Sequence, residues 1–102
     1  MTPPYWAVIF TSRRSSVDAG YSEMAAKMEA LAAQQPGYLG IEHAGGAEGS
    51  ITVSYWRSEQ DLLAWKQVME HREAQRLGKE QWYREYEVRV CKVERAYGFA
   101  KK

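Results

Sequence analysis

Four segments of the chain have the apolar patterns expected of β-strands: one is a compact run of aromatic and branched residues, and the other three alternate apolar and polar residues. The strands are predicted at Tyr5–Thr11, Tyr38–Ala44, Ser50–Trp56 and Trp82–Phe99. Glycines between the second and third segments supply the turn of a β-hairpin. The fourth segment is much longer than a typical strand of about 5 to 6 residues.

The length of this last segment has a consequence for assembly. A sheet built by a chain of 102 residues cannot pair all of it, and folded proteins avoid exposing unpaired strand edges. We expect the part through Val90 to complete the chain's own sheet and the part from Cys91 to Phe99 to belong with a second subunit. The chain is therefore predicted to form a homodimer with an exchanged C-terminal strand.

A first helix is predicted between the first two strands, because apolar residues there recur at helical spacing. The helical pattern begins at Val17, and Ser15 or Ser16 is available as the N-terminal cap. Pro36 and Gly37 end the helix before the second strand.

A second helix is predicted after the hairpin. Ser58 and Asp61 have the spacing of a capping box, with Asp in place of the usual Glu. Trp65 lies on the apolar side of this helix, which continues through His71 to Leu77 and stops at Gly78.

The predicted order of elements is β-α-β-β-α-β, which is typical of a ferredoxin-like split βαβ fold. The fold class is therefore α+β, with one domain over residues 1–102, an antiparallel sheet and both helices on one face. The other face of the sheet is too apolar for solvent, so we expect a second copy to cover it. To this face we assign Thr52, Ser54, Trp56, Arg89, Val93 and Tyr97.

Composition narrows the class of protein. Hydrophobic residues make up 45% and charged residues 26%, which are ordinary values for a globular domain. Fourteen basic and thirteen acidic residues give a net charge of +1 without a long basic run, so nucleic acid is not an expected partner. No apolar segment suits a signal peptide or a membrane span, which predicts a cytoplasmic protein with no membrane association.

The cysteine and the histidines do not form a metal-binding pattern. The single Cys91 and the two histidines, His43 and His71, lie on separate predicted elements, so no metal site is expected. His43 is in phase with Leu39 and Ile41 on the second strand, which predicts a buried, hydrogen-bonded imidazole.

The longest distinctive part of the sequence is YWRSEQDLLAWKQVMEHREAQRLGKEQWYREYEVRVCKVERAYGF, and PGYLGIE precedes the hairpin. From Tyr5 to Phe99 the chain resembles the antibiotic biosynthesis monooxygenase family. The resemblance implies a homodimer in which two sheets form a dimeric α+β barrel. Some members of this family oxidise aromatic polyketide intermediates with molecular oxygen and no cofactor, and others degrade haem.

The haem-degrading branch carries an Asn on its first strand, a Trp on its second helix and a His further along that helix. Trp65 matches the Trp, but the sequence contains no Asn, and Gln75 stands where the His would be. The resemblance therefore implies no cofactor, with molecular oxygen as the co-substrate, and haem is not expected.

Three residues are candidates for catalysis. Oxygenation without a cofactor requires a base that deprotonates the substrate and donors that hold the resulting oxyanion. His71 is the candidate base by its intrinsic pKa, although its charged neighbours equally suit an exposed position. Trp65 is either plain core or the wall of a cavity between helix and sheet. Tyr83 either binds or protonates an oxyanion or fills the dimer interface.

Three more residues are candidates for substrate binding. Arg89 is predicted to face away from the helices, where it either anchors a carboxylate or enolate or forms an intersubunit salt bridge with Glu87, Glu94 or another residue of the partner. Trp56 is predicted on the same face as a barrel or dimer residue, and Tyr86 accompanies Tyr83 at the start of the last strand.

These observations predict a cofactor-independent monooxygenase acting on an aromatic or quinone-type small molecule. The alternative is a non-catalytic or stress-associated dimer that uses the same barrel to hold a small aromatic ligand. A weaker alternative is a haem-binding or haem-degrading protein.

Overall fold

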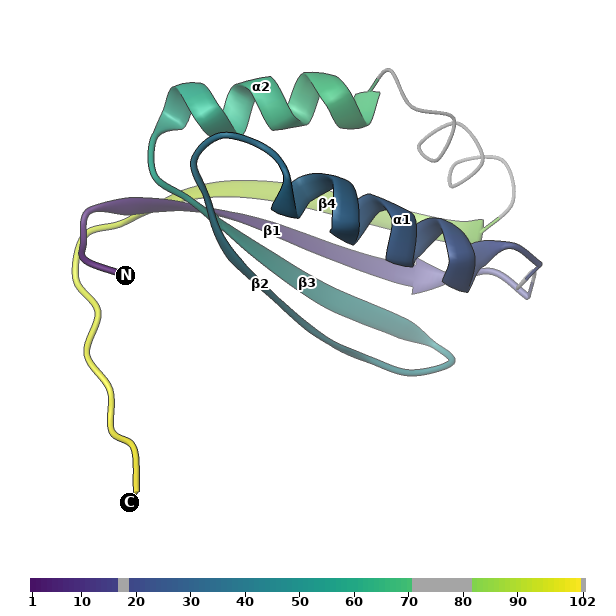
Figure 1. Ribbon diagram of the computed structural model, residues 1–102. Helices are drawn as coiled ribbons and strands as arrows, with labels where there is room; N and C mark the ends of the chain where they lie inside the picture. Colours follow the sequence, from purple (N-terminus) through teal and green to yellow (C-terminus); the bar gives the residue numbers. More distant parts are fainter. Residues whose placement is uncertain (17–18, 71–81, 102) are drawn as a thin grey trace.

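The computed structural model describes residues 1–16, 19–70 and 82–101. It confirms the predicted α+β, ferredoxin-like order of elements: β1 (Tyr5–Arg14), α1 (Tyr21–Ala33), β2 (Tyr38–Gly45), β3 (Gly49–Trp56), α2 (Glu59–Glu70) and β4 (Tyr83–Val93). The strands form one antiparallel sheet in the order β2-β3-β1-β4. Both helices cover the same face of this sheet (Figure 1).

β1 lies in the interior of the sheet and runs longer than predicted. It pairs with β3 from Trp6 to Arg13 and with β4 from Tyr5 to Arg14. Because neighbours on both sides hydrogen-bond its backbone, the strand continues beyond Thr11 into residues whose polar side chains gave no strand signal of their own.

The side chains of the third strand that were predicted to face away from the helices face toward them in the structure. Thr52 and Ser54 line a cavity beneath the helices, and Trp56 is fully buried in the core. Strict alternation separates two sets of side chains but does not say which set faces inward. The buried core consists of Val8, Ala32, Trp56, Leu62 and Trp65.

α1 begins at Tyr21 rather than at Val17. Its N-cap is Gly20, which has φ 81° and no side-chain capping bond, so neither predicted serine caps the helix. Ser15 instead remains with the sheet, because its amide donates to the Trp82 carbonyl at 2.8 Å. The indole Nε1 of Trp82 also donates to the Ala19 carbonyl at 3.0 Å, which fixes the approach to α1.

The predicted capping interaction at the start of α2 is confirmed. The Asp61 amide donates to Ser58 Oγ at 3.1 Å, and Ser58 Oγ donates to Asp61 Oδ2 at 2.9 Å. The predicted continuation of this helix from His71 to Leu77 lies outside the described residues. As far as the described residues go, neither α1 nor α2 has the length and apolar character that a membrane-spanning helix needs.

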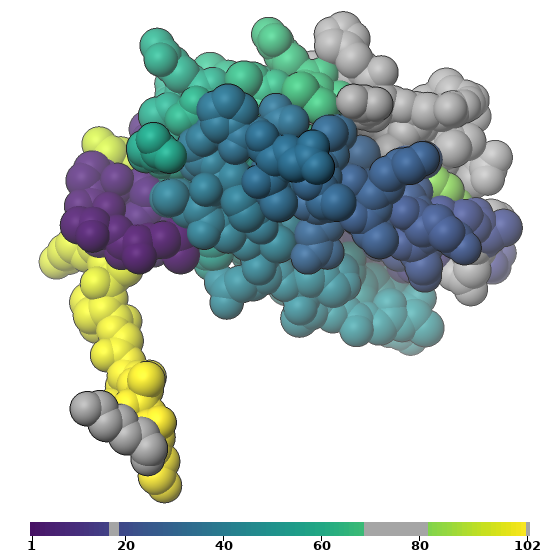
Figure 2. Space-filling view, viewed as in Figure 1, coloured from purple at the N-terminus to yellow at the C-terminus, as the bar shows by residue number. Residues whose placement is uncertain are grey.

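β4 is shorter than the extended segment predicted from Trp82 to Phe99. It ends at Val93, and Cys91 to Val93 pair with β1 of the same chain, so these three residues are not left for a partner. Residues 94–101 have no regular secondary structure and leave the body of the molecule as a thin tail (Figures 1 and 2). Tyr97 is 97% exposed and Phe99 91% exposed on this tail.

Candidate functional site

A cavity of about 490 Å³ lies between α1 and the helix-covered face of the sheet. Residues from each described helix and strand line it: β1 and β4 supply apolar and aromatic groups, and β2 and β3 supply polar groups together with Ile41. Its volume falls in the range of about 300–1,000 Å³ that is typical of small-molecule sites. The cavity is therefore large enough for a ligand of several fused or linked rings.

Aromatic rings gather at the β4 end of the cavity. Phe10 stacks on Tyr86 with ring centroids 5.2 Å apart, and its ring meets that of Tyr83 edge-on at 5.5 Å. Tyr21 of α1 packs edge-on against Tyr83 at 6.0 Å and against Trp82 at 5.8 Å. Tyr83 and Tyr86, which the sequence singled out, are thus brought together at one wall.

Tyr83 has the most perturbed phenol of this wall. Burial raises its pKa well above the ordinary value, and the hydrogen bond with Tyr21 raises it further, whereas the charge of Arg14 lowers it. A phenol with a raised pKa stays protonated at neutral pH. Tyr83 therefore lines the cavity as a neutral phenol.

The opposite part of the cavity carries hydroxyl groups and an imidazole. His43 Nδ1 lies 2.7 Å from Thr52 Oγ1, and Ser50 Oγ lies 3.1 Å from Ser12 Oγ. Ser54 Oγ accepts a hydrogen bond from Trp56 Nε1 at 2.9 Å. This polar floor contrasts with the aromatic wall, so the cavity can orient a ligand with one polar edge.

His43 was not among the candidate site residues. It is hydrogen-bonded as predicted, but it is exposed on β2 rather than buried. One feature of the sequence could have identified His43 as a site residue. It is in phase with Ile41 on the second strand, and both residues line the cavity. The pairing of His43 with Thr52 across the hairpin would have strengthened that inference.

Two tryptophans support the cavity in different ways. Trp65 lines it and is 5% exposed, and its ring stacks on Trp56 at 5.8 Å with an interplanar angle of 22°. Trp56 has no exposed surface and does not line the cavity, so its predicted place on the barrel face is wrong. Trp56 acts as the packing surface behind Trp65.

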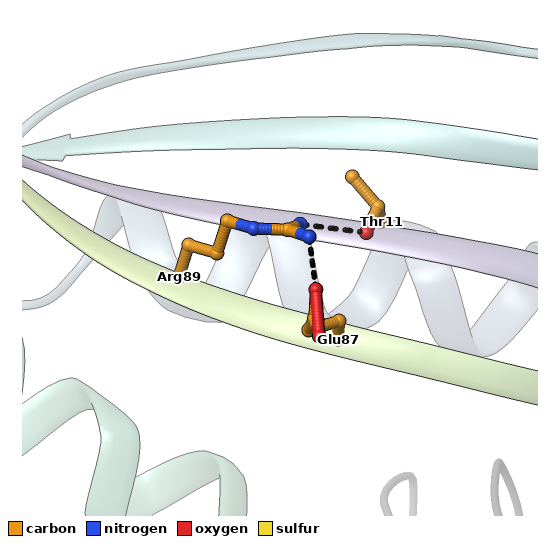
Figure 3. A network of polar contacts seen from close by, with 3 residues as sticks. All are labelled: Thr11, Glu87 and Arg89. Atoms are coloured by element: carbon orange, nitrogen blue, oxygen red, sulfur yellow. Dashed lines mark hydrogen bonds and ion pairs between the residues drawn. The ribbon is translucent and has the colours of Figure 1, made fainter.

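Arg89 lies on the side of the sheet away from the helices, as predicted, and does not line the cavity. Figure 3 shows its guanidinium between β1 and β4, where Nη2 pairs with Glu87 Oε1 and Nη1 donates to Thr11 Oγ1 at 3.3 Å. Arg89 thus pairs with Glu87 of its own chain, whereas the salt bridge was expected between subunits, and it is not part of the cavity wall.

His71, the predicted base, lies outside the described residues. Among residues 1–16, 19–70 and 82–101, no three His, Cys, Asp or Glu side chains are placed to share a metal ion. Cys91 is a free, half-buried thiol on β4.

The chain was compared with known proteins. No protein-family model matches the sequence. Over 94 residues the chain is 50% identical to YqjZ of Bacillus subtilis strain 168, an uncharacterised protein, and the match covers 91% of this chain and 82% of YqjZ.

Solved structures with the same fold are more distant in sequence. SnoaB, a cofactor-independent oxygenase from Streptomyces nogalater, superposes with a TM-score of 0.73 at 12% identity, over 92% of this chain and 97% of SnoaB. A candidate antibiotic biosynthesis monooxygenase from Nitrosomonas europaea gives 0.76 at 10% identity, over 91% and 93%. A candidate monooxygenase from Shewanella loihica gives 0.60 at 24% identity, over 93% and 100%.

The likeness to these structures concerns the fold of the single chain, and it confirms the α+β, ferredoxin-like order of elements with a four-stranded antiparallel sheet. The identity to YqjZ extends over most of both chains. The chain therefore belongs to the family of YqjZ and has the fold of the antibiotic biosynthesis monooxygenases.

Proposed function

We propose that the protein is a cofactor-independent monooxygenase acting on an aromatic or quinone-type small molecule bound in the cavity. The observation that carries this proposal is the pairing of an aromatic wall, which holds the raised-pKa phenol of Tyr83, with a floor that holds the imidazole of His43. Flat rings pack well against aromatic side chains. The phenol on the wall and the hydroxyls and imidazole on the floor can form hydrogen bonds with oxygen substituents on the rings of such a substrate.

The proposed reaction uses the substrate as its own reductant. A base removes a proton from an acidic ring carbon, and the resulting carbanion transfers electrons to molecular oxygen and forms a carbon–oxygen bond. Loss of water from the peroxide then converts a CH₂ group into C=O, so one oxygen atom enters the product and the other leaves as water. The protein contributes the base, the positioning and the stabilisation of the oxyanion.

Tyr83 is assigned to the oxyanion, because it lines the cavity and its phenol is protonated. Tyr86 and Trp65 supply ring surface against which the substrate stacks. Arg89 is not part of this proposal, since it lies on the opposite side of the sheet.

Two imidazoles compete for the role of base. His71 remains the prediction from the sequence, and His43 is the imidazole that lines the cavity among the described residues. His43 can accept a proton at Nε2 only in the tautomer whose Nδ1–H donates to Thr52 Oγ1. Thr52 would thus hold the ring in the tautomer that the reaction needs.

One structural relative supports the proposal. SnoaB, whose fold this chain shares, is a cofactor-independent oxygenase. YqjZ, which is half identical in sequence, is uncharacterised, so the substrate is inferred from the cavity alone.

The test is oxygen consumption by the purified protein with a panel of anthrones and hydroquinones, after subtraction of autoxidation without protein. We expect Tyr83→Phe to lower kcat roughly 100-fold, because a phenol that stabilises the oxyanion is lost. If His43 is the base, His43→Gln should lower kcat by about 100-fold or more. If His71 is the base, His71→Gln should have that effect instead. Tyr38→Phe, which removes a phenol outside the cavity, serves as the matched control.

Binding is measured separately by quenching of tryptophan fluorescence, since Trp65 and Trp82 line the cavity. Oxygen consumption that is equal in the wild type, Tyr83→Phe and both histidine variants would contradict the proposal. Saturable quenching without any turnover would instead support the non-catalytic, ligand-binding alternative. A Soret shift on titration with haem would favour the haem-binding alternative.

We also propose that the chain forms a homodimer through the outer face of the sheet, defined here by Ile9, Ile51, Val53, Tyr55 and Arg89. Neither α1 nor α2 covers this face, and Ile51 on it is 51% exposed. The tail, with the rings of Tyr97 and Phe99 in solvent, is the segment proposed to cross to the partner. A cytoplasmic location remains a prediction from the sequence.

A further inference from the structure

Three arginines gather at the far end of β1, outside the cavity. Arg13, Arg14 and Arg84 line a second hollow of about 390 Å³ together with Ser15, Ser16, Ala47 and Glu48. The lining carries three positive side chains and one negative side chain, whereas the whole chain has a net charge of only +1. The positive charge is therefore a local feature of this end of the sheet.

An irregularity in strand pairing brings the third arginine to this place. Arg13 pairs with Glu85, but Arg14 pairs with Tyr83, so Arg84 is an extra residue on β4. Such a β-bulge bends the strand and changes the direction of a side chain, and bulges are common beside functional sites. The bulge places Arg84 with two consecutive arginines of β1 around one hollow.

The backbone of the hollow is held on two sides. The Arg14 amide donates to the Glu48 carbonyl at 2.9 Å, which ties β1 to the β2–β3 hairpin. The Ser15 amide donates to the Trp82 carbonyl at 2.8 Å, which ties β1 to the segment before β4. These hydrogen bonds already order the backbone that carries the arginines. Ligand binding therefore loses little additional backbone entropy there.

The side chains differ in how firmly they are placed. The Arg14 guanidinium carbon lies 3.5 Å from the centroid of the Tyr21 ring, a stacked cation–π arrangement. Arg13 pairs with Glu85 at 3.1 Å, but the two side chains are 61% and 68% exposed. Exposed ion pairs of this kind contribute little, so Arg13 can exchange Glu85 for a ligand at small cost.

We propose that this hollow is an anion site that binds a phosphate group, such as that of a phosphate monoester. A guanidinium group matches the geometry of a phosphate and can donate two parallel hydrogen bonds to two of its oxygens. The hydroxyls of Ser15 and Ser16 are further donors at the rim. Above its second pKa of about 6, a phosphate monoester carries close to two negative charges, which balances the excess of positive charge in the lining. The proposal does not depend on the oxygenase activity.

The test is titration of the whole protein with inorganic phosphate at about pH 7.5, where phosphate is mainly dianionic, at constant ionic strength. Backbone amide shifts in ¹H–¹⁵N NMR spectra report the binding. We expect saturable shifts, and Arg84→Gln should weaken binding roughly tenfold or more because a charged hydrogen bond is lost. Arg57→Gln removes the same charge from an exposed position outside the hollow and should change the affinity less than about twofold.

A second arm tests whether the site selects phosphate. Succinate at the same ionic strength should bind more weakly, because each carboxylate carries one charge; equal affinity would overturn the assignment to phosphate. An equal loss in Arg84→Gln and Arg57→Gln, or shifts that do not saturate, would show non-specific binding and overturn the site. If circular dichroism shows that Arg84→Gln is unfolded, Arg13→Gln replaces it with the same expected loss.

Discussion

The two faces of the sheet are built from the same strands but have different chemistry. On the helix-covered face, Trp56 and Trp65 stack in a closed core, and a cavity opens beside them. The outer face is covered by neither α1 nor α2, and it carries the half-exposed Ile51 as well as charged residues such as Arg89 and Glu87. Residues that neighbour each other in sequence thus contribute alternately to a ligand site and to an open surface.

This difference assigns the two proposed roles to opposite sides of one sheet. Ligand binding belongs to the face where α1 leaves a cavity over β1 and β3, and dimer formation belongs to the face that neither α1 nor α2 covers. If the assignment is right, substitutions on one face should leave the property of the other face nearly unchanged. The predictions below test that independence.

The largest effect is expected from Trp56→Ala on the helix-covered face. Truncating a fully buried tryptophan leaves a cavity and should lower the free energy of unfolding by about 3–5 kcal/mol. Urea denaturation measures the change. Ile51→Ala on the outer face should cost about 0.5 kcal/mol in the monomer; a comparable loss from both variants would contradict the contrast between the faces.

A smaller effect is expected from Ile51→Asp on the outer face. In the proposed dimer this carboxylate would be buried without a partner charge, so the dimer dissociation constant should rise roughly 100-fold. Sedimentation velocity across a range of protein concentrations measures the constant, and the circular dichroism spectrum of the monomer should be preserved.

A chain ending at Val93 tests the contribution of the tail to the same association. It keeps the whole sheet but lacks Tyr97 and Phe99, so it too should associate more weakly. A wild-type protein that sediments as a monomer at all concentrations would refute the dimer itself.

The smallest effect concerns Tyr55, at the edge of the outer face. Tyr55 Oη donates to Glu42 Oε1 at 2.6 Å, and this hydrogen bond, followed by burial, raises the pKa of the phenol to about 12. The folded-state pKa is above the unfolded value of about 10, so the stabilisation is fully present below about pH 10 and is lost as the pH rises through about 12. An NMR titration of the Tyr55 ring should show this midpoint, and Glu42→Gln should lower it; an unchanged midpoint would exclude the carboxylate as the cause.

The order of elements followed from the sequence because local signals agreed with the tertiary structure. The hairpin glycines, the Ser58–Asp61 cap and the apolar stripe around Trp65 each act over a few residues, and each was found where expected. The aromatic start of β4 left Tyr83 and Tyr86 as residues of either a site or an interface, and in the structure both line the cavity.

The site was harder to predict because it depends on which face the helices cover. The small polar residues Thr52 and Ser54 were assigned outward, yet they face the helices, since a cavity rather than packed core lies above them. His43 was expected to be a buried imidazole in phase with Ile41, and the sequence did not show that both residues line a cavity. The position of Arg84 depends on a bulge between distant strands, for which the local sequence carries no signal.

The two hydrogen bonds at Trp82 give a direct way to observe motion at the cavity. The Trp82 carbonyl accepts from the Ser15 amide, and its indole donates to Ala19 just before α1. Lifting this end of α1 away from the sheet would have to separate these groups. The hydrogen-exchange rate of the Ser15 amide therefore reports how often this end of the cavity opens to solvent, and a ligand that fills the cavity should slow that exchange.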